Sequence, residues 1–194
     1  MSKYLFQPNE WDTNAFDYVY TPNCDEFSTF EQEQTCIKNK KGNYIFGYEY
    51  ISILEKNLHK SGAIISTRCA FESFGAPLLV FTNDVTVDEN GRYRYGEHYE
   101  VVAYEKGCNV WHIIPAPKNE PDKKIVPTKL AHLEFAIQNN QITDITVEIV
   151  GKIIKIDING NKLKLEIPNF PEQFRAGITA CEGINRFYEF AIVE

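Results

Sequence analysis

Residues 145–167 read ITVEIVGKIIKIDINGNKLKLEI, and this stretch has the clearest structural pattern in the chain. Apolar and polar residues alternate within it in three runs, at residues 145–149, 154–158 and 163–167. A period of two residues is typical of strands that have one buried face and one solvated face. Gly151 separates the first two runs, and the dipeptide Asn159-Gly160, a strong hairpin signal, separates the last two. The stretch therefore predicts a three-stranded antiparallel meander.

The composition of the whole chain agrees with a sheet protein. The 194 residues include 21 Ile, 13 Phe and 11 Tyr but only 9 Leu and 11 Ala. Helical proteins rely on Leu and Ala, whereas sheets favour β-branched and aromatic residues. The length suits one domain with a substantial core, so we expect residues 1–194 to form a single all-β domain.

Further short strands are expected along the chain, and their number predicts a β-sandwich or barrel. The expected strands span residues 44–53, 62–71, 78–82, 98–104, 109–114, 130–137, 175–180 and 187–193. The best helix candidate is a short segment at residues 52–60. Residues 115–128 are rich in proline and charge, so we expect a long surface loop there.

Charge and cysteine usage exclude several classes of protein. Lys and Arg number 20 against 27 Asp and Glu, and the formal charge of −7 argues against a nucleic-acid or anionic-membrane binder. No run of about 18 apolar residues is present, so no transmembrane helix is expected. The five cysteines are widely spaced without a C-x-x-C motif, which predicts reduced thiols and argues against a disulfide framework or a zinc site. We expect no metal site and no cofactor. Because no apolar segment follows the first residues, we expect a cytoplasmic protein.

The order of motifs resembles a known superfamily. After the meander come FRAGI at 174–178 and NRFYEFAI at 185–192, while GAPLLV at 75–80, YEVV at 99–102 and NVW at 109–111 occupy the middle of the chain. This order is similar to that of the concanavalin A-like lectin/glucanase jelly rolls. The resemblance implies a two-sheet antiparallel jelly-roll β-sandwich with a sugar site on the concave face of one sheet. The superfamily holds lectins, glycosidases, polysaccharide lyases and non-catalytic modules, so fold alone does not choose among them.

The hairpin at residues 98–114 supplies the expected site. A four-residue loop would pair Tyr104 with Asn109 and Val102 with Trp111, which places these side chains on one face together with Glu100. An aromatic plate beside planar polar groups suits the C–H face and hydroxyls of a sugar. With two side chains of an earlier strand added, the predicted concave cleft is lined by Arg68, Glu72, Glu100, Tyr104, Asn109 and Trp111.

A second interpretation of the same residues stays open. A one-residue bulge would exchange the two faces of the hairpin. Trp111 would then anchor the core, and Glu100 would be an ion-pair partner of Arg68.

The sequence leaves three functional classes. The first is recognition of a glycan or a small polar ligand. The second is an enzyme, but residues 97–105 lack the central Asp and the spacing of the glucanase pattern E-x-D-x-x-E, and the motifs of the jelly-roll lyases are absent although His98 and Tyr104 supply suitable residue types. The third is a protein-interaction module that could form a homodimer.

Overall fold

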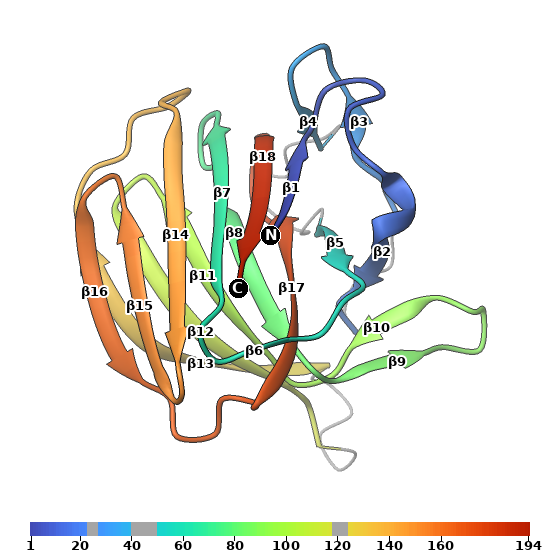
Figure 1. The fold of residues 1–194 in the computed structure, drawn as a ribbon, viewed down its shortest axis with the longest axis vertical. Coiled ribbons are helices and arrows are strands. Elements are labelled where there is room, and N and C mark those ends of the chain that lie inside the picture. The colour runs from blue at the N-terminus through green and yellow to red at the C-terminus, as the bar shows by residue number, and fades with distance from the viewer. Residues whose placement is uncertain (23–26, 40–49, 118–123) are drawn as a thin grey trace.

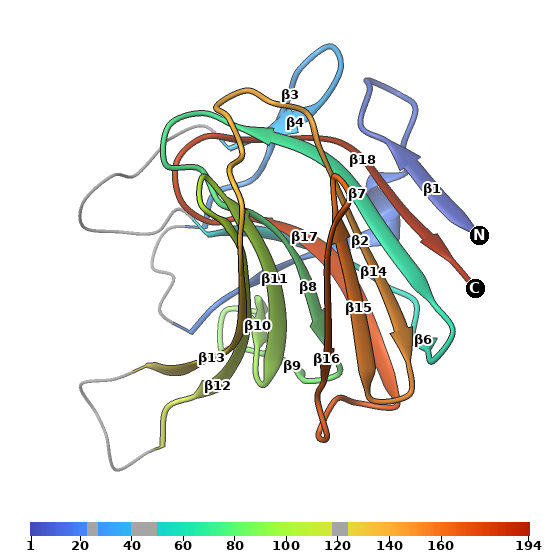
Figure 2. The same cartoon turned by 90° about the vertical axis from the view of Figure 1, so that its left-hand side faces the viewer.

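The computed structural model describes residues 1–22, 27–39, 50–117 and 124–194. Apart from a single turn of 3-10 helix, η1 (Thr13–Ala15), its regular elements are strands. They form two curled sheets that pack against each other (Figures 1 and 2). The prediction of an all-β, two-sheet jelly-roll sandwich is confirmed.

The larger sheet has ten strands in the described part of the chain, in the order β13-β12-β11-β8-β17-β5-β2-β10-β9, with β6 added beside β17. Their bounds are β2 (Phe16–Tyr20), β5 (Ile51–Glu55), β6 (His59–Lys60), β8 (Pro77–Thr82), β9 (Val85–Val87), β10 (Tyr93–Tyr95), β11 (His98–Tyr104), β12 (Gly107–Pro115), β13 (Ile125–Glu134) and β17 (Gln173–Ala180).

The smaller sheet has the order β16-β15-β14-β7-β18-β4-β3, with β1 paired to β18. Its strands are β1 (Ser2–Leu5), β3 (Glu31–Gln32), β4 (Ile37–Lys38), β7 (Ile64–Phe71), β14 (Thr143–Val150), β15 (Ile153–Ile158), β16 (Asn161–Glu166) and β18 (Asn185–Val193). Figure 1 shows both termini at this sheet, where β1 and β18 run side by side.

The predicted meander is confirmed as β14-β15-β16, all antiparallel. Its second turn contains Asn159 at φ 51° and Gly160 at φ 87°, the left-handed conformation that an Asn-Gly hairpin turn requires. The inward residues of β14 and β15, such as Ile145, Val147 and Ile156, are at most 2% exposed. They pack into one core with inward residues of the larger sheet, so the alternation in sequence corresponds to the two faces of the smaller sheet.

The helix expected at residues 52–60 is wrong, because this segment forms β5 and β6. All five residues of β5 are at most 1% exposed. A strand that is covered on both faces shows no period-two pattern. The polar residues Ser52 and Glu55 also interrupt the apolar run that would have indicated a buried strand. Residues 44–49 of the strand expected at 44–53 lie outside the described residues.

The loop expected at residues 115–128 is wrong at both ends. β12 continues to Pro115, and β13 begins at Ile125 and includes Pro127, which lies opposite Ile113. β13 is the last strand in the sheet order, and an edge strand tolerates a residue without an N–H donor. Residues 118–123 lie outside the described residues.

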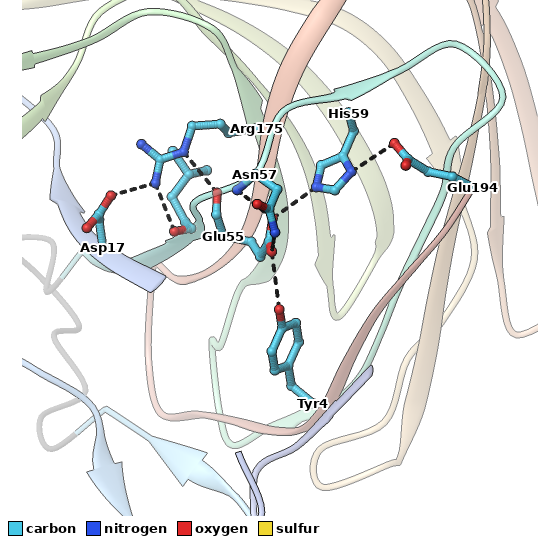
Figure 3. A network of polar contacts seen from close by, with 8 residues as sticks. Tyr4, Asp17, Glu55, Asn57, His59, Arg175 and Glu194 are labelled. Atoms are coloured by element: carbon cyan, nitrogen blue, oxygen red, sulfur yellow. Dashed lines mark hydrogen bonds and ion pairs between the residues drawn. The ribbon is translucent and has the colours of Figure 1, made fainter. Parts of the chain in front are cut away.

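A buried polar network joins the chain ends to the larger sheet (Figure 3). The carboxylate of Glu55 is fully buried and accepts hydrogen bonds from the Tyr4 hydroxyl at 3.2 Å and the Asn57 backbone N–H at 2.9 Å. His59 places Nε2 at 3.0 Å from Glu55 and Nδ1 at 3.1 Å from Glu194. The network therefore ties β1, β5, β6 and the end of the chain together.

The network extends to β2 and β17 through Arg175. Its guanidinium donates to the carbonyl oxygens of Glu55 at 2.9 Å and Leu54 at 3.1 Å, and to the Asp17 carboxylate at 2.7 Å. Lys56 lies 3.5 Å from the same carboxylate of Asp17. Each of these contacts holds strands in place, and the buried position of Glu55 favours a structural role for the cluster.

The network shifts two pKa values in opposite directions. Burial disfavours the charge of Glu55, but hydrogen bonds from His59 and Asn57 outweigh it and hold its pKa below the ordinary 4.5. Burial likewise disfavours the imidazolium of His59, but its bonds to Glu55 and Glu194 outweigh burial and raise its pKa above 6.5. Glu55 therefore stabilises the folded state at pH values above its ordinary pKa, and this stabilisation is lost as the pH falls through the lowered pKa that Glu55 has in the folded state. His59 stabilises the fold below its ordinary pKa and loses this effect as pH rises through its raised value.

We therefore expect the contribution of this pair to be largest between pH 4.5 and pH 6.5. His59→Gln should lower the free energy of unfolding by about 1–2 kcal/mol near pH 6, and should flatten the loss of stability toward pH 9, because the amide gains no charge. Urea unfolding across the pH range measures both effects. His112→Gln is the control, since His112 pairs with Glu97 at a more exposed position. Parallel pH profiles for the wild type and His59→Gln would contradict the assignment.

Gly107 is required where β11 turns into β12. Its φ is 127°, and a Cβ there would lie 2.0 Å from the carbonyl oxygen of Leu133 on β13. Gly62 has a similar φ of 101° with nothing within 4 Å of an added Cβ.

We expect Gly62→Ala to cost about 1–2 kcal/mol from backbone strain alone. Gly107→Ala should lower the free energy of unfolding, measured with urea, by roughly 1–3 kcal/mol more than Gly62→Ala does, because β13 must also move away from the added methyl group. Equal costs would show that the approach of β13 is not constraining.

Candidate functional site

The outer face of the larger sheet, which points away from the inter-sheet core, carries most of the predicted site. Tyr99, Val101 and Ala103 of β11 belong to the main core. Since alternate residues point to opposite faces, Glu100 and Val102 lie on the outer face. A second apolar cluster covers this face, and it contains Val19, Tyr50, Leu54, Ala76, Leu78, Val80, Tyr95 and Val102.

The hairpin has a different register from the predicted one. Glu100 lies opposite Trp111, Val102 opposite Asn109 and Tyr104 opposite Gly107, so the turn consists of Glu105 and Lys106. The predicted four-residue loop is wrong by a shift of two residues along β12. A shift by an even number keeps every side chain on its face. Trp111 therefore shares the outer face with Glu100 and packs against the second cluster instead of the inter-sheet core.

Arg68 and Glu72 are separated from the other four predicted residues. Arg68 lies on β7 of the smaller sheet, and its guanidinium pairs with Asp144 at 2.9 Å on an exposed face. Glu72 follows the same strand and pairs with Arg186 at 2.7 Å. The expectation that all six residues line one cleft is wrong, because β7 pairs with β14 and β18 and not with β11. The alternative ion pair between Arg68 and Glu100 is wrong for the same reason.

Glu100 lies beneath the outer face and is only 5% exposed. The Tyr50 hydroxyl donates a hydrogen bond to its carboxylate. Burial, and then the charge of Glu100, raise the pKa of Tyr50 well above its ordinary value, so the phenol remains a donor. Nε2 of His98, also buried, lies 3.6 Å from Glu100 while Nδ1 donates to the Gly96 carbonyl at 2.9 Å.

A partly exposed group of polar and aromatic side chains lies at one end of this face. We name it the β11–β13 patch, and it consists of Tyr104, Asn109, Trp111, Lys129 and His132. The Lys129 ammonium lies 5.0 Å from the centre of the Trp111 ring, in a cation–π arrangement. The Tyr104 and His132 rings lie 6.3 Å apart.

The hydrogen bonds of His132 fix its tautomer. Nδ1 lies 3.0 Å from the Asn109 side-chain oxygen and 3.1 Å from the Cys108 carbonyl oxygen. Both oxygens are acceptors, so Nδ1 carries the proton. In the neutral ring, Nε2 is then an acceptor. The patch thus combines an aromatic face, an ammonium, an amide, an imidazole and a phenol.

Sequence reasoning missed Lys129 and His132 because β13 contains a bulge. Trp111 lies opposite Lys129, while the neighbouring Val110 lies opposite Ala131, so Leu130 is an extra residue. An extra residue reverses the alternation beyond it. Lys129 and His132, three positions apart, consequently face the same side, whereas regular alternation would place them on opposite sides. The run 129–134 carried no signal of this break.

No other constellation among the described residues suggests metal chemistry. No group of three or more His, Cys, Asp or Glu side chains in the described ranges is arranged to hold a metal ion. Cys36, Cys69, Cys108 and Cys181 are free thiols, and the first three are buried. Cys24 lies outside the described residues. None of the described helices has the length and apolar character to cross a bilayer.

No protein-family model matches the sequence, and no curated protein matches it. Among solved structures, the chain is similar to the carbohydrate-binding module CBM66 from Bacillus subtilis at 11% identity and a TM-score of 0.65, covering 93% of this chain and 96% of that one. A glycoside hydrolase family 16 endo-glucanase from Bacteroides ovatus matches at 10% identity and a TM-score of 0.64, covering 99% of both chains. A legume lectin-like domain from Entamoeba histolytica matches at 10% identity and a TM-score of 0.56, covering 93% of this chain and 90% of that one.

Identities near 10% establish the fold and do not transfer a function. The three proteins share a jelly-roll sandwich with this chain across at least 90% of each length. The resemblance seen in the order of motifs is confirmed by these structures. The chain has the concanavalin A-like jelly-roll fold of the lectins and glucanases.

Proposed function

We propose that the protein binds a glycan at the β11–β13 patch. The observation that carries the proposal is the position of Trp111, which is half-buried on the outer face with polar side chains around it. An indole ring in this setting offers a flat apolar surface to the C–H face of a sugar ring. Its lower part is held by the second apolar cluster, so little side-chain freedom is lost on binding.

The polar members of the patch match the hydroxyl groups of a sugar. Lys129 supplies an ammonium donor, and Asn109 supplies both a donor and an acceptor. His132 adds an acceptor at Nε2 and already orients the Asn109 amide through Nδ1. Such an arrangement is pre-organised for directional hydrogen bonds around an aromatic plate.

The environment of Glu100 favours binding over hydrolysis. A retaining glycosidase needs two carboxyl groups about 5 Å apart, one of which attacks the sugar. Glu100 is buried, and its contacts are the phenol of Tyr50 and the imidazole of His98. The structural neighbours, which include a carbohydrate-binding module, a lectin-like domain and a glucanase, support a glycan-related role without choosing among these three.

Trp111→Ala tests the location of the site. We expect at least a tenfold loss of affinity, about 1.4 kcal/mol or more, on a glycan that binds the wild type, with the fold retained because Trp111 lies outside the inter-sheet core. A glycan array followed by calorimetry measures affinity, and circular dichroism checks the fold. Phe74→Ala is the control, since Phe74 is an aromatic residue that is 62% exposed on another part of the chain. Unchanged glycan affinity in Trp111→Ala would overturn the placement, and a stable dimer without glycan affinity would favour the interaction-module alternative.

Glu100→Gln separates binding from catalysis. We expect the wild type to release neither reducing ends nor unsaturated uronides from a polysaccharide panel, and the variant to bind the same glycans with an affinity within about twofold. The amide keeps an oxygen that accepts from Tyr50, so the fold should persist. Product formation by the wild type that disappears in Glu100→Gln would instead establish a hydrolase or lyase.

A further inference from the structure

A cavity of about 200 Å³ opens at one end of the sandwich, between β2 and β5 of the larger sheet and β3 and β4 of the smaller sheet. These four strands lie beyond β17 and β18, away from β11–β13 (Figure 1). The cavity is lined by Trp11, Thr13, Phe16, Tyr18, Phe30, Gln32, Ile37 and Ile53. Half of the lining residues are aromatic, and none of these described residues is charged.

The aromatic walls are held by one another. The Trp11 ring packs edge-on against Phe6 at 5.0 Å and against Phe16 at 5.7 Å, and the Tyr18 ring lies 6.4 Å from Phe30. Phe6 and Phe16 belong to the main core. The walls are therefore fixed before any ligand arrives, which limits the entropic cost of binding.

The polar atoms of the lining are largely engaged already. The indole N–H of Trp11 donates to Oε1 of Gln32 at 3.0 Å. The Gln32 amide nitrogen lies 2.9 Å, 2.7 Å and 3.1 Å from the carbonyl oxygens of Phe6, Glu33 and Cys36. The Tyr18 hydroxyl accepts from the backbone N–H of Phe30 at 3.2 Å. A ligand in the cavity would meet mainly ring faces and aliphatic groups.

We propose that this cavity binds a small, uncharged aromatic molecule of one or two fused rings. An enclosed apolar cavity of about 150 Å³ takes up benzene, and this open cavity of about 200 Å³ has room for a slightly larger ring system. Aromatic lining atoms that face solvent lack close dispersion partners on that side, and an aromatic guest supplies these contacts. A sugar would lose the hydration of several hydroxyls without new partners, and a carboxylate would be buried unpaired. This site is therefore chemically distinct from the β11–β13 patch.

The test uses indole and toluene as neutral probes and benzoate as a charged probe of similar size. Ligand-observed NMR and calorimetry on the full chain should show saturable one-to-one binding of both neutral probes, and the melting temperature should be higher in their presence. The affinity for benzoate should be weaker than that for the neutral probes by roughly tenfold or more. No saturable binding of indole or toluene, or equal affinity for benzoate, would overturn the proposal.

Two variants locate the binding. Ile53→Phe adds a ring inside the cavity from β5, and Thr13→Tyr adds one at the exposed mouth, where a change of fold is not expected. Each should weaken indole binding by roughly tenfold or more while circular dichroism remains that of the wild type. Val87→Phe, at a strand position that is 60% exposed, adds the same ring elsewhere and should leave binding unchanged. Should Ile53→Phe fail to fold, Thr13→Tyr decides, and unchanged indole affinity in a folded Thr13→Tyr overturns the placement.

Discussion

Burial of the larger sheet on both faces is the constraint that determines where a ligand can bind. The central strands β5 and β8 are buried along their whole length, with Leu78 and Val80 fully covered on the outer side and Leu79 fully covered on the inner side. The inner side meets the smaller sheet, and the outer side is covered by the second apolar cluster. The centre of the outer face is thus filled. Among the described residues, partly exposed side chains on this face lie toward the strands that flank the centre, and the β11–β13 patch occupies one such position.

The same constraint explains the polar groups beneath the second cluster. A buried hydroxyl or carboxylate destabilises the fold unless it is hydrogen-bonded. Ser52 accepts from Thr179 at 2.8 Å and lies 2.6 Å from the Tyr95 hydroxyl, while Tyr50 satisfies Glu100. These side-chain hydrogen bonds add to the backbone hydrogen bonds between strands. They link β5 to β17 and to β10, and they link Tyr50 to β11. Glu100 was predicted from the sequence to contact a ligand. In the structure it belongs to the buried polar groups beneath the second cluster, and it holds Tyr50 in place over the sheet.

Local pattern was sufficient to predict the meander and most of the longer strands, because each depends on residues close in sequence, but it left the face of Trp111 open and took β5 and β6 for a helix. The sheet to which Arg68 belongs could not be predicted in this way, since β7 pairs with β14 and β18, which come from distant parts of the chain. The bulge at Leu130 was also invisible, although it brings Lys129 beside Trp111. The pair Glu55 and His59 has helical spacing in sequence, and only the fold shows that a strand and a turn bring these two side chains together.

The two proposed sites differ in how strongly the fold prescribes them. The cavity at β2 and β5 exists because aromatic rings from three segments, namely Trp11, Phe16 and Tyr18 of β2, and Phe30, support one another and leave a space that the described side chains do not fill. The patch exists because an edge strand carries a bulge, and bulges are frequent at sheet edges, where they change the direction of side chains. In the sheet order, β8 and β17 lie between the cavity and the β11–β13 patch. The described residues that line the cavity do not include any member of the patch. A neutral aromatic guest and a glycan therefore depend on separate side chains, and substitution at one site leaves the chemistry of the other intact.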